Sequence, residues 1–251
     1  SVDVNKAFYG NTYADVAGAN INISSKELTG YGEVNASVSG GFNTQSLSSD
    51  FLKMDGVNAF GFANSKQPGD DLSVYNFQNR LDPSKKNGLV NQSYSISGGK
   101  KFDINDNPLS FYLIANHNRD YSYYEEEVRN SITTGELSQD MIGKKSNVET
   151  SQVVMANLNY LHNNKHELTY NFIMLHASRE SVGDYLGMDA DYQSSDTYEG
   201  FMRRQQTNDN LLFVNQLDTK WALADKLDFN VGAAYNIIKG LEPDRRINNL
   251  V

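Results

Sequence analysis

The chain has 251 residues with 15 Tyr, 12 Phe and only four Pro, and its net charge is −9. The negative charge and the lack of a basic cluster argue against a nucleic-acid partner, because phosphate recognition concentrates Lys and Arg. The absence of Cys excludes disulfides, thiolate metal sites and Cys nucleophiles. No stretch approaches the roughly 18 consecutive apolar residues that a membrane-spanning helix needs.

The first long stretch of alternating residues runs from Gly30 to Asn43. Its apolar or small residues recur at every second position, and polar residues such as Glu33 and Asn35 fill the positions between them. A period of two predicts a strand with one apolar and one polar face. The apolar face consists of Val34, Ala36, Val38, Gly40 and Phe42.

Six more stretches alternate in the same way and predict three hairpins. Their expected strands lie at about 90–102, 109–115, 154–160, 168–174, 211–223 and 227–237. Short polar turns are expected at 103–108, 162–165 and 224–226, since Asn and Asp favour turns. Long polar excursions are expected at 44–88, 124–150 and 179–206, and the chain is expected to leave the last strand at Gly240.

Short turns on one side and long loops on the other are typical of bacterial outer-membrane barrels and uncommon in compact soluble domains. Aromatic residues gather near the expected short turns, where they would form one girdle at the level of the lipid headgroups. These residues are Phe102, Phe111, Tyr160, Tyr170, Trp221 and Phe229. The sequence therefore predicts an all-β fold, a transmembrane antiparallel β-barrel. Seven strands are too few and odd in number, so we expect further strands beyond Val251 or from a second polypeptide.

The segment from Tyr13 to Lys26 reads YADVAGANINISSK, a Gly-containing turn followed by a short alternating strand and a Lys. It resembles the end of the plug domain in TonB-dependent outer-membrane receptors. The Asn- and Tyr-rich composition and the segment from Gly240 to Arg246 are similar to receptors of the Bacteroidetes type. The resemblance implies that residues 1–28 end an N-terminal plug domain and that residues 29–251 form about the first seven strands of a 22-stranded barrel.

The resemblance also implies a function in the bacterial outer membrane: import of a specific extracellular nutrient, such as a siderophore, a glycan or a peptide, through a plugged barrel. The implied partners are outer-membrane lipid and lipopolysaccharide, TonB through a segment upstream of Ser1, and a surface lipoprotein. No cofactor is expected. The residues show no enzyme signature either, since none of the four His residues accompanies an evident Ser nucleophile motif.

Candidate ligand-binding residues lie in two of the expected loops. Tyr121, Tyr123 and Tyr124 precede the acidic run 125–127, and aromatic rings at a loop base suit a sugar, a peptide or a metal chelate. The alternative is an outer aromatic belt below a solvated acidic loop. In the next excursion Tyr192 and Arg203 could hold an anionic ligand, because Arg makes bidentate contacts. Their neighbours Tyr185, Tyr198 and Arg204 share this interpretation, and loop packing or lipopolysaccharide contact is the alternative.

Metal sites are not expected. Four acidic residues of the first excursion could bind calcium, but solvation of a long loop explains them more simply: Asp50, Asp55, Asp70 and Asp71. The run Asp103, Asn105, Asn107 begins like a calcium loop, yet Pro108 stands where that loop needs Gly. His162 and His166 have the spacing of helical metal ligands but flank an expected hairpin turn.

Two other functions stay open at this point. A non-transporting barrel that anchors a surface or secretion assembly would have the same strands. A diffusion porin would also have them, although the plug-like strand speaks against an open lumen. The imported ligand cannot be named, because specificity resides in loops that vary on a fixed scaffold.

Overall fold

The computed structural model describes residues 28, 30–48, 50–64, 73, 82–87, 89–190, 200–224 and 227–250, together with two short strands near the N-terminus. These strands are β1 (Val2–Asn5) and β2 (Asn20–Ile23), and they pair antiparallel. The short strand expected after Gly18 is therefore present as β2. No helix of the described residues is long and apolar enough to cross a membrane.

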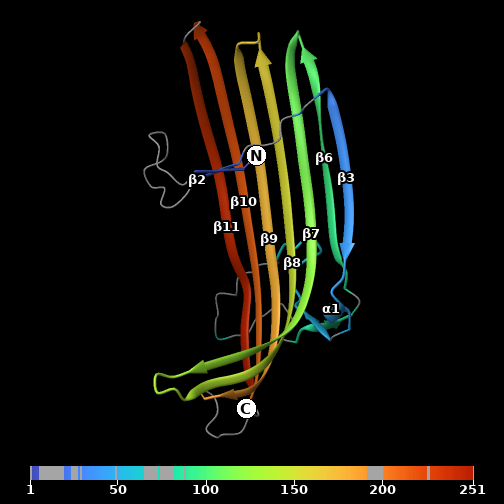
Figure 1. The fold of residues 1–251 in the computed structure, drawn as a ribbon, viewed down its shortest axis with the longest axis vertical. Helices are drawn as coiled ribbons and strands as arrows, with labels where there is room; N and C mark the ends of the chain where they lie inside the picture. Colours follow the sequence, from blue (N-terminus) through green and yellow to red (C-terminus); the bar gives the residue numbers. More distant parts are fainter. Residues whose placement is uncertain are drawn as a thin grey trace.

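The main body is one antiparallel sheet of seven strands, in which every strand lies beside its neighbour in sequence (Figure 1). The prediction of an all-β fold with seven alternating strands is confirmed. The two outermost strands are not paired with each other, so the sheet is open across the described residues. The strands are β3 (Gly32–Gly41), β6 (Asn91–Ile104), β7 (Asn107–Ser131), β8 (Leu137–His162), β9 (His166–Asp189), β10 (Gly200–Ala224) and β11 (Leu227–Leu250).

The tight hairpin turns lie where the sequence predicted them. Asn105 and Asp106 have φ of 49° and 61°, and Asn163 and Asn164 both have φ of 52°. Two consecutive left-handed residues form the turn that matches the twist of a two-residue hairpin, and Asn and Asp tolerate this conformation best. The third turn, between Ala224 and Leu227, falls on residues 225–226, outside the described part of the chain.

The prediction of a long loop is wrong for two of the three polar excursions. Residues 124–150 are not a loop, because β7 continues to Ser131 and β8 begins at Leu137. The segment 179–206 is largely strand as well, since β9 reaches Asp189 and β10 starts at Gly200. The chain also stays in β11 beyond Gly240. Part of this polar sequence, including Thr150 and Ser178, is buried beneath another segment of the chain, as described below.

The excursion between β3 and β6 folds back onto the sheet. It contains the short helix α1 (Thr44–Ser48) and a two-stranded sheet of β4 (Phe51–Lys53) and β5 (Ser84–Lys86). Residues 50–64, here called the covering segment, contact β7, β8, β9 and β10, with Phe51 and Met54 fully or almost fully buried. The expected long polar excursion is therefore present here, but part of it packs against the sheet.

The sheet has two faces, which we name by what they carry. The belt face carries Phe111, Leu158, Tyr170 and Leu217, which lie in register on neighbouring strands. The pocket face carries their chain neighbours, and an adjacent row there consists of Tyr112, Asn157, Asn171 and Gln216. This alternation follows from the period of two in each strand.

The belt face changes character half-way along the strands. In its turn half, near the turns at 105–106 and 163–164, apolar side chains are exposed; Phe111 is 38% exposed and Ile96 50%. In its loop half, polar side chains are buried; Thr150 is 2% exposed and Glu180 3%. The change occurs over two successive rows of the belt face. It runs from the row of Ala115, Val154, Met174 and Phe213, through the row of His117, Gln152, His176 and Leu211, to the row of Arg119, Thr150, Ser178 and Asp209.

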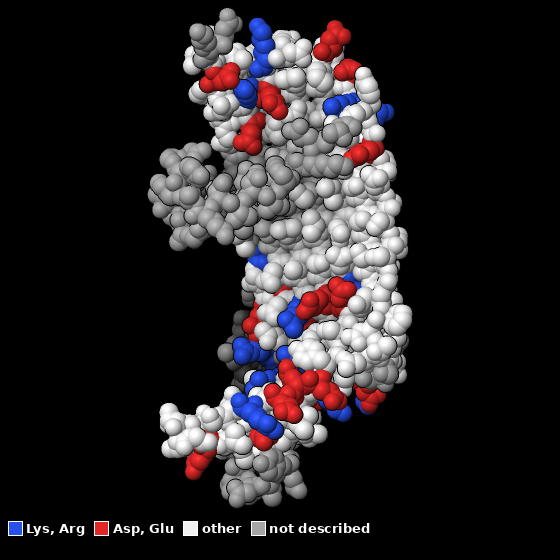
Figure 2. Space-filling model, in the orientation of Figure 1, with Lys and Arg blue, Asp and Glu red and all other residues white. Residues whose placement is uncertain are grey.

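All six predicted girdle aromatics lie on the turn half of the belt face, and five of them have large exposed fractions. On the face that Figure 2 shows, charged side chains gather toward the two ends of the sheet. The described residues build only a small internal apolar cluster, Met141, Tyr185 and Met202, with Val128 packed against it. The exposed belt therefore has no second protein layer among the described residues.

Candidate functional site

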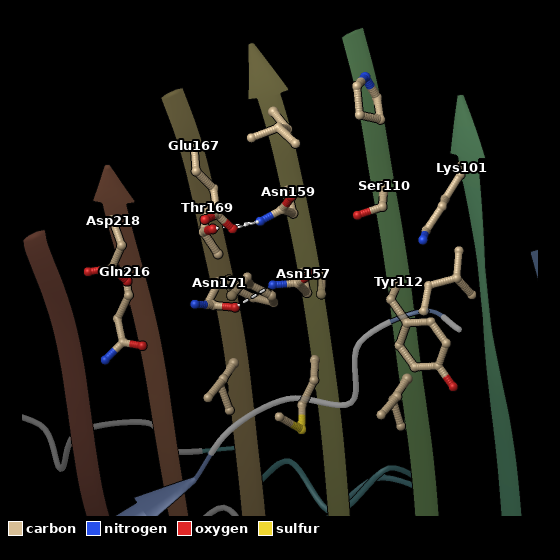
Figure 3. A pocket seen from close by; sticks show the side chains of 18 residues that line it. Lys101, Ser110, Tyr112, Asn157, Asn159, Glu167, Thr169, Asn171, Gln216 and Asp218 are labelled. Atoms are coloured by element: carbon tan, nitrogen blue, oxygen red, sulfur yellow. Dashed lines mark hydrogen bonds between the residues drawn. The ribbon is translucent and has the colours of Figure 1, made fainter. Parts of the chain in front are cut away.

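A cavity of about 520 Å³ lies on the pocket face, toward the turn end of the sheet (Figure 3). Hydrogen bonds from the side-chain amides of Asn157 and Asn159 bridge β8 and β9 in its wall. Asn157 donates to Asn171 Oδ1 at 2.7 Å, and Asn159 donates to Thr169 Oγ1 at 2.9 Å and to Glu167. The alternation that makes the belt face apolar directs these polar residues to the opposite side.

Leu28 reaches this cavity from the N-terminal part of the chain. It is buried, and it lines the cavity together with Tyr112, which is also buried. Lys101, Glu167 and Asp218 add charges of both signs to the wall (Figure 3). The cavity therefore offers many hydrogen-bonding groups and an apolar contact, which suits the seating of a polypeptide segment.

A second group of side chains lies on the pocket face near the loop end. Tyr185 rests over Gly143 and Gly183, where a Cβ atom on either glycine would meet the ring at 2.5 Å and 2.7 Å. Its hydroxyl donates to Glu126 Oε1 at 2.6 Å, and the Arg204 guanidinium lies 5.5 Å from the ring centroid. Burial and the hydrogen bond to Glu126 raise the pKa of the Tyr185 hydroxyl, so this tyrosine is neutral at physiological pH.

Lys145 and Tyr124 complete this loop-end cluster. Lys145 Nζ lies 3.9 Å from Glu126 Oε1 and 5.8 Å from the Tyr124 ring centroid. The cluster thus combines two aromatic rings with one carboxylate and two cations. Such a surface can stack on a ring and hydrogen-bond hydroxyl or amide groups.

Of the five predicted ligand-binding residues, the four that the structure describes are divided between the two faces. Tyr121 and Tyr123 lie on the belt face, and Tyr121 packs edge-on against Phe51 of the covering segment, with ring centroids 5.9 Å apart. Arg203 lies there too and pairs with Asp184 through two contacts of 2.7 Å and 2.8 Å. Tyr124 alone lies on the pocket face, in the loop-end cluster. Tyr192, like the neighbouring Tyr198, is outside the described residues.

The other residues that the sequence singled out lie apart from these clusters. Asp103, Asn105 and Asn107 lie at a hairpin turn, as expected. His162 and His166 are cross-strand partners with ring centroids 6.3 Å apart. Asp70 and Asp71 fall outside the described residues, and Asp50 pairs with Lys85 at 2.6 Å. Within the described part of the chain, no three His, Cys, Asp or Glu residues are grouped so that they could hold a metal ion.

Sequence reasoning missed the buried polar residues beneath the covering segment. His176 Nε2 lies 2.8 Å from Asp209 Oδ1, and the His176 ring stacks on Phe62 with centroids 3.9 Å apart. The other carboxylate oxygen of Asp209 accepts a hydrogen bond from the Ala63 backbone at 2.8 Å. No local signal announces this contact, because it joins residues that are 146 positions apart.

Glu180 is also buried beneath this segment. Burial raises its pKa to about 7, while Lys53 and Arg119 lower it and Asp55 raises it further. Its Oε2 atom has no hydrogen-bond partner among the described residues. Glu180 lies in the loop half, well beyond the exposed apolar belt.

No family model, curated protein or solved structure matches this chain.

Proposed function

We propose that the chain forms part of a TonB-dependent outer-membrane receptor that imports a specific extracellular nutrient. In this proposal the seven strands are a section of a transmembrane β-barrel, the belt face contacts lipid and the pocket face lines the lumen. The turn end lies toward the periplasm and the loop end toward the cell exterior.

The exposed turn half of the belt face is the observation that carries the proposal. A soluble sheet would bury its apolar face against a second layer, because burial contributes about 25 cal/mol per Å². Here apolar side chains in the turn half of β6, β7, β10 and β11 are exposed or only partly buried, and Ile96, Phe111, Leu217 and Phe229 are among the exposed ones. Lipid satisfies such a face without a second layer, and the tight turns suit the periplasmic ends of barrel strands.

The length of the strands agrees with this arrangement. A barrel strand needs about 9–11 residues to cross the hydrocarbon layer. Strands β7 to β11 have 24 to 26 residues, so about half of each is left for the region outside the membrane. The polar loop half of the belt face, which the covering segment protects, supplies that extramembrane part.

The cavity of the pocket face supports the presence of a plug. Leu28 is the described residue that reaches the cavity from the N-terminal side, and the paired amides of β8 and β9 present hydrogen-bonding groups to whatever lies against them. In the proposal, the N-terminal segment that ends at about residue 28 is the last part of the plug, and it seals the lumen against this wall.

The loop-end cluster is the proposed ligand contact. Tyr124, Glu126, Lys145, Tyr185 and Arg204 face the same side as the cavity and lie nearer the proposed exterior. A nutrient that enters the lumen would meet these residues before it meets the plug. A siderophore, a glycan or a peptide all carry the hydroxyl, amide or ring groups that such a surface binds.

Uptake by cells tests this function. Strains that produce the full-length protein would be given a labelled ferric chelate, glycan, peptide or cobalamin, with and without a functional TonB. We expect uptake of one nutrient class that disappears when TonB is deleted. Uptake that survives the deletion would contradict active import. A large steady conductance in planar bilayers would instead favour a porin, and an inert sealed barrel would favour a scaffold.

A further inference from the structure

Residues 56–64 of the covering segment form a turn whose backbone polar groups bond within the protein. Asn58 organises it: its Oδ1 accepts hydrogen bonds from the backbone of Phe60 at 2.9 Å and of Phe62 at 3.1 Å. The Asn58 backbone donates to the Phe62 carbonyl and accepts from Gly61, both at 3.1 Å. Asn64 donates to the Gly56 carbonyl at 2.8 Å, and a bridge joins Val57 to Ala63.

The sheet provides partners for several of the remaining groups. Gln152 Nε2 donates to the Phe60 carbonyl at 3.0 Å, and Arg119 donates to the Ala59 carbonyl at 2.5 Å. Asp209 accepts from the Ala63 backbone. A loop in water would not need this internal bonding, whereas backbone at the depth of hydrocarbon must have it, because each unsatisfied group there costs several kcal/mol.

The side chains of the same turn continue the apolar belt. Phe60 is 59% exposed, and its ring meets the His117 ring edge-on with centroids 5.7 Å apart. Together with Phe62 it walls a groove of about 410 Å³ against β3, β6, β7 and β8. Val38, Tyr94, Ile96 and Val154 form the opposite wall, and no Asp, Glu, Lys or Arg lines the groove.

We propose that this turn is a lipid-binding element, in which Phe60 inserts into the outer leaflet and the groove holds an acyl chain of an outer-leaflet lipid. The inference rests on the proposed function, since it requires the belt face to contact lipid. The groove opens directly onto the exposed belt residues Val38, Tyr94 and Ile96. An acyl chain therefore fits its chemistry, whereas an ion would find no Asp, Glu, Lys or Arg partner there.

The turn then gives the barrel an aromatic residue at its outer interface. Trp221 and Phe229 mark the opposite, turn-end boundary of the belt, where they are cross-strand partners. Phe60 does not belong to a barrel strand, so the residue that anchors the outer boundary comes from a segment folded over the strands from outside. The contacts with Arg119, Gln152 and Asp209 hold it at that level.

Tryptophan quenching by brominated lipid tests the inference. Trp221 is the single Trp of these 251 residues, so Trp221→Phe, with any Trp elsewhere in the full-length protein also replaced by Phe, gives a dark background for Phe60→Trp. Ile96→Trp serves as the belt control, and Ile132→Trp, at the exposed tip of the β7–β8 hairpin, as the water control. The full-length protein would be reconstituted in phosphatidylcholine vesicles whose acyl chains carry bromine. Val38→Trp, on the other wall of the groove, provides a second readout that leaves the turn unchanged.

We expect quenching at positions 60 and 38 to match that at position 96 and to exceed that at position 132 several-fold. If the tryptophan at position 60 behaves like that at position 132 while position 96 is quenched, the lipid-binding turn is refuted and the proposed barrel stands. If positions 60 and 38 are shielded from both lipid and aqueous acrylamide, protein fills the groove, and the inference again fails. If position 96 itself is unquenched, the proposed membrane location fails.

Discussion

The turn half and the loop half of the belt face differ in which side chains they expose and which they bury. Both belong to the same strands and have the same register. The turn half presents exposed apolar side chains such as Ile96 and Phe229, whereas the loop half buries Thr150, Ser178 and Glu180 beneath residues 50–64. A solvent-facing sheet would show the reverse pattern, with apolar groups covered and polar groups exposed. The comparison supports the proposal that this face passes from lipid to water along each strand.

The largest effect is expected from a charge in the turn half. Leu113→Arg places a guanidinium near the middle of the belt and should destabilise the membrane-inserted protein by about 2–4 kcal/mol. Gln216→Arg lies one step away in the register but on the pocket face, and it should have little effect. The free energy of unfolding of both variants would be measured by titrating the protein in lipid vesicles with guanidinium chloride. Equal destabilisation of the two would break the distinction between the faces.

The next effect concerns the fit of the covering segment on the loop half. Gly61 has φ of +83°, and an added Cβ would lie 2.4 Å from Ser178 Oγ and 2.8 Å from Thr150 Cβ. Gly61→Ala should therefore weaken docking by about 2–3 kcal/mol, combining backbone strain with overpacking. Gly135 has φ of +87° and open space around it, so Gly135→Ala isolates the strain, about 1 kcal/mol.

Amide hydrogen exchange at Phe60, Phe62 and Ala63 reports this docking. Faster exchange at these three amides in Gly61→Ala, with unchanged exchange in Gly135→Ala, is the expected result. Similar exchange rates in the two variants would contradict the close contact of Gly61 with Thr150 of β8 and Ser178 of β9.

Docking of the covering segment on the loop half should also depend on pH. Glu180 has a folded-state pKa of about 7, above the ordinary value of 4.5, because burial disfavours its charge. The Glu180 carboxyl therefore binds its proton more tightly when the covering segment is docked on the sheet. Docking should weaken as the pH rises from 4.5, the ordinary pKa, through about 7, the raised pKa. The loss should be about 2 kcal/mol between about pH 5.5 and 8.

A nitroxide on Asn64→Cys would report this change, because Asn64 is exposed and its backbone bonds within the turn. The label should be less mobile at the lower pH. Glu180→Gln should keep it immobile throughout this range, since the amide is uncharged. A pH response that persists in Glu180→Gln would refute the role of Glu180.

The smallest effect is expected where the loop half is open to solvent. Lys144 Nζ lies 3.9 Å from Glu125 Oε1, and both side chains are more than 60% exposed. Water screens such a pair, so Lys144→Ala should change the free energy of unfolding by less than about 0.5 kcal/mol. A loss of 1 kcal/mol or more in a thermal or chemical unfolding experiment would show that this end of the sheet is less hydrated than the comparison requires.

The sequence predicts the strands and the turn half well, because both depend on local signals. Alternation needs only a period of two, and the pairs Asn105–Asp106 and Asn163–Asn164 suit the left-handed turns that they form. The extension of β7, β8 and β9 into polar sequence was missed, since Thr150 and Ser178 are polar yet buried. A signal was nevertheless present: residues 124–150 contain no Pro, and Val148 continues the alternation.

The candidate site could be predicted only in part for a related reason. Aromatic and charged residue types indicated Tyr124 as a candidate. The side of the sheet on which it lies could not be predicted, because a residue in an expected loop cannot be assigned to a face. Once β7 is extended, alternation sends Tyr121 and Tyr123 to the belt face and Tyr124 to the pocket face. The contact of Asp209 with Ala63 depends on how the covering segment folds back, and that is a property of the whole chain.

Spin labels on neighbouring residues test the central claim, that the turn half of the belt face contacts lipid. These 251 residues contain no Cys, so a single Cys introduced at Val38, Leu113 or Val231 is the one labelling site within them. Asn230 is the matched control, because it is adjacent to Val231, is also exposed and lies on the pocket face. In vesicles, the three belt labels should collide more with dissolved oxygen than with an aqueous nickel complex, and the Asn230 label should show the reverse preference. An aqueous or protein-packed signal at all three belt positions would contradict the account.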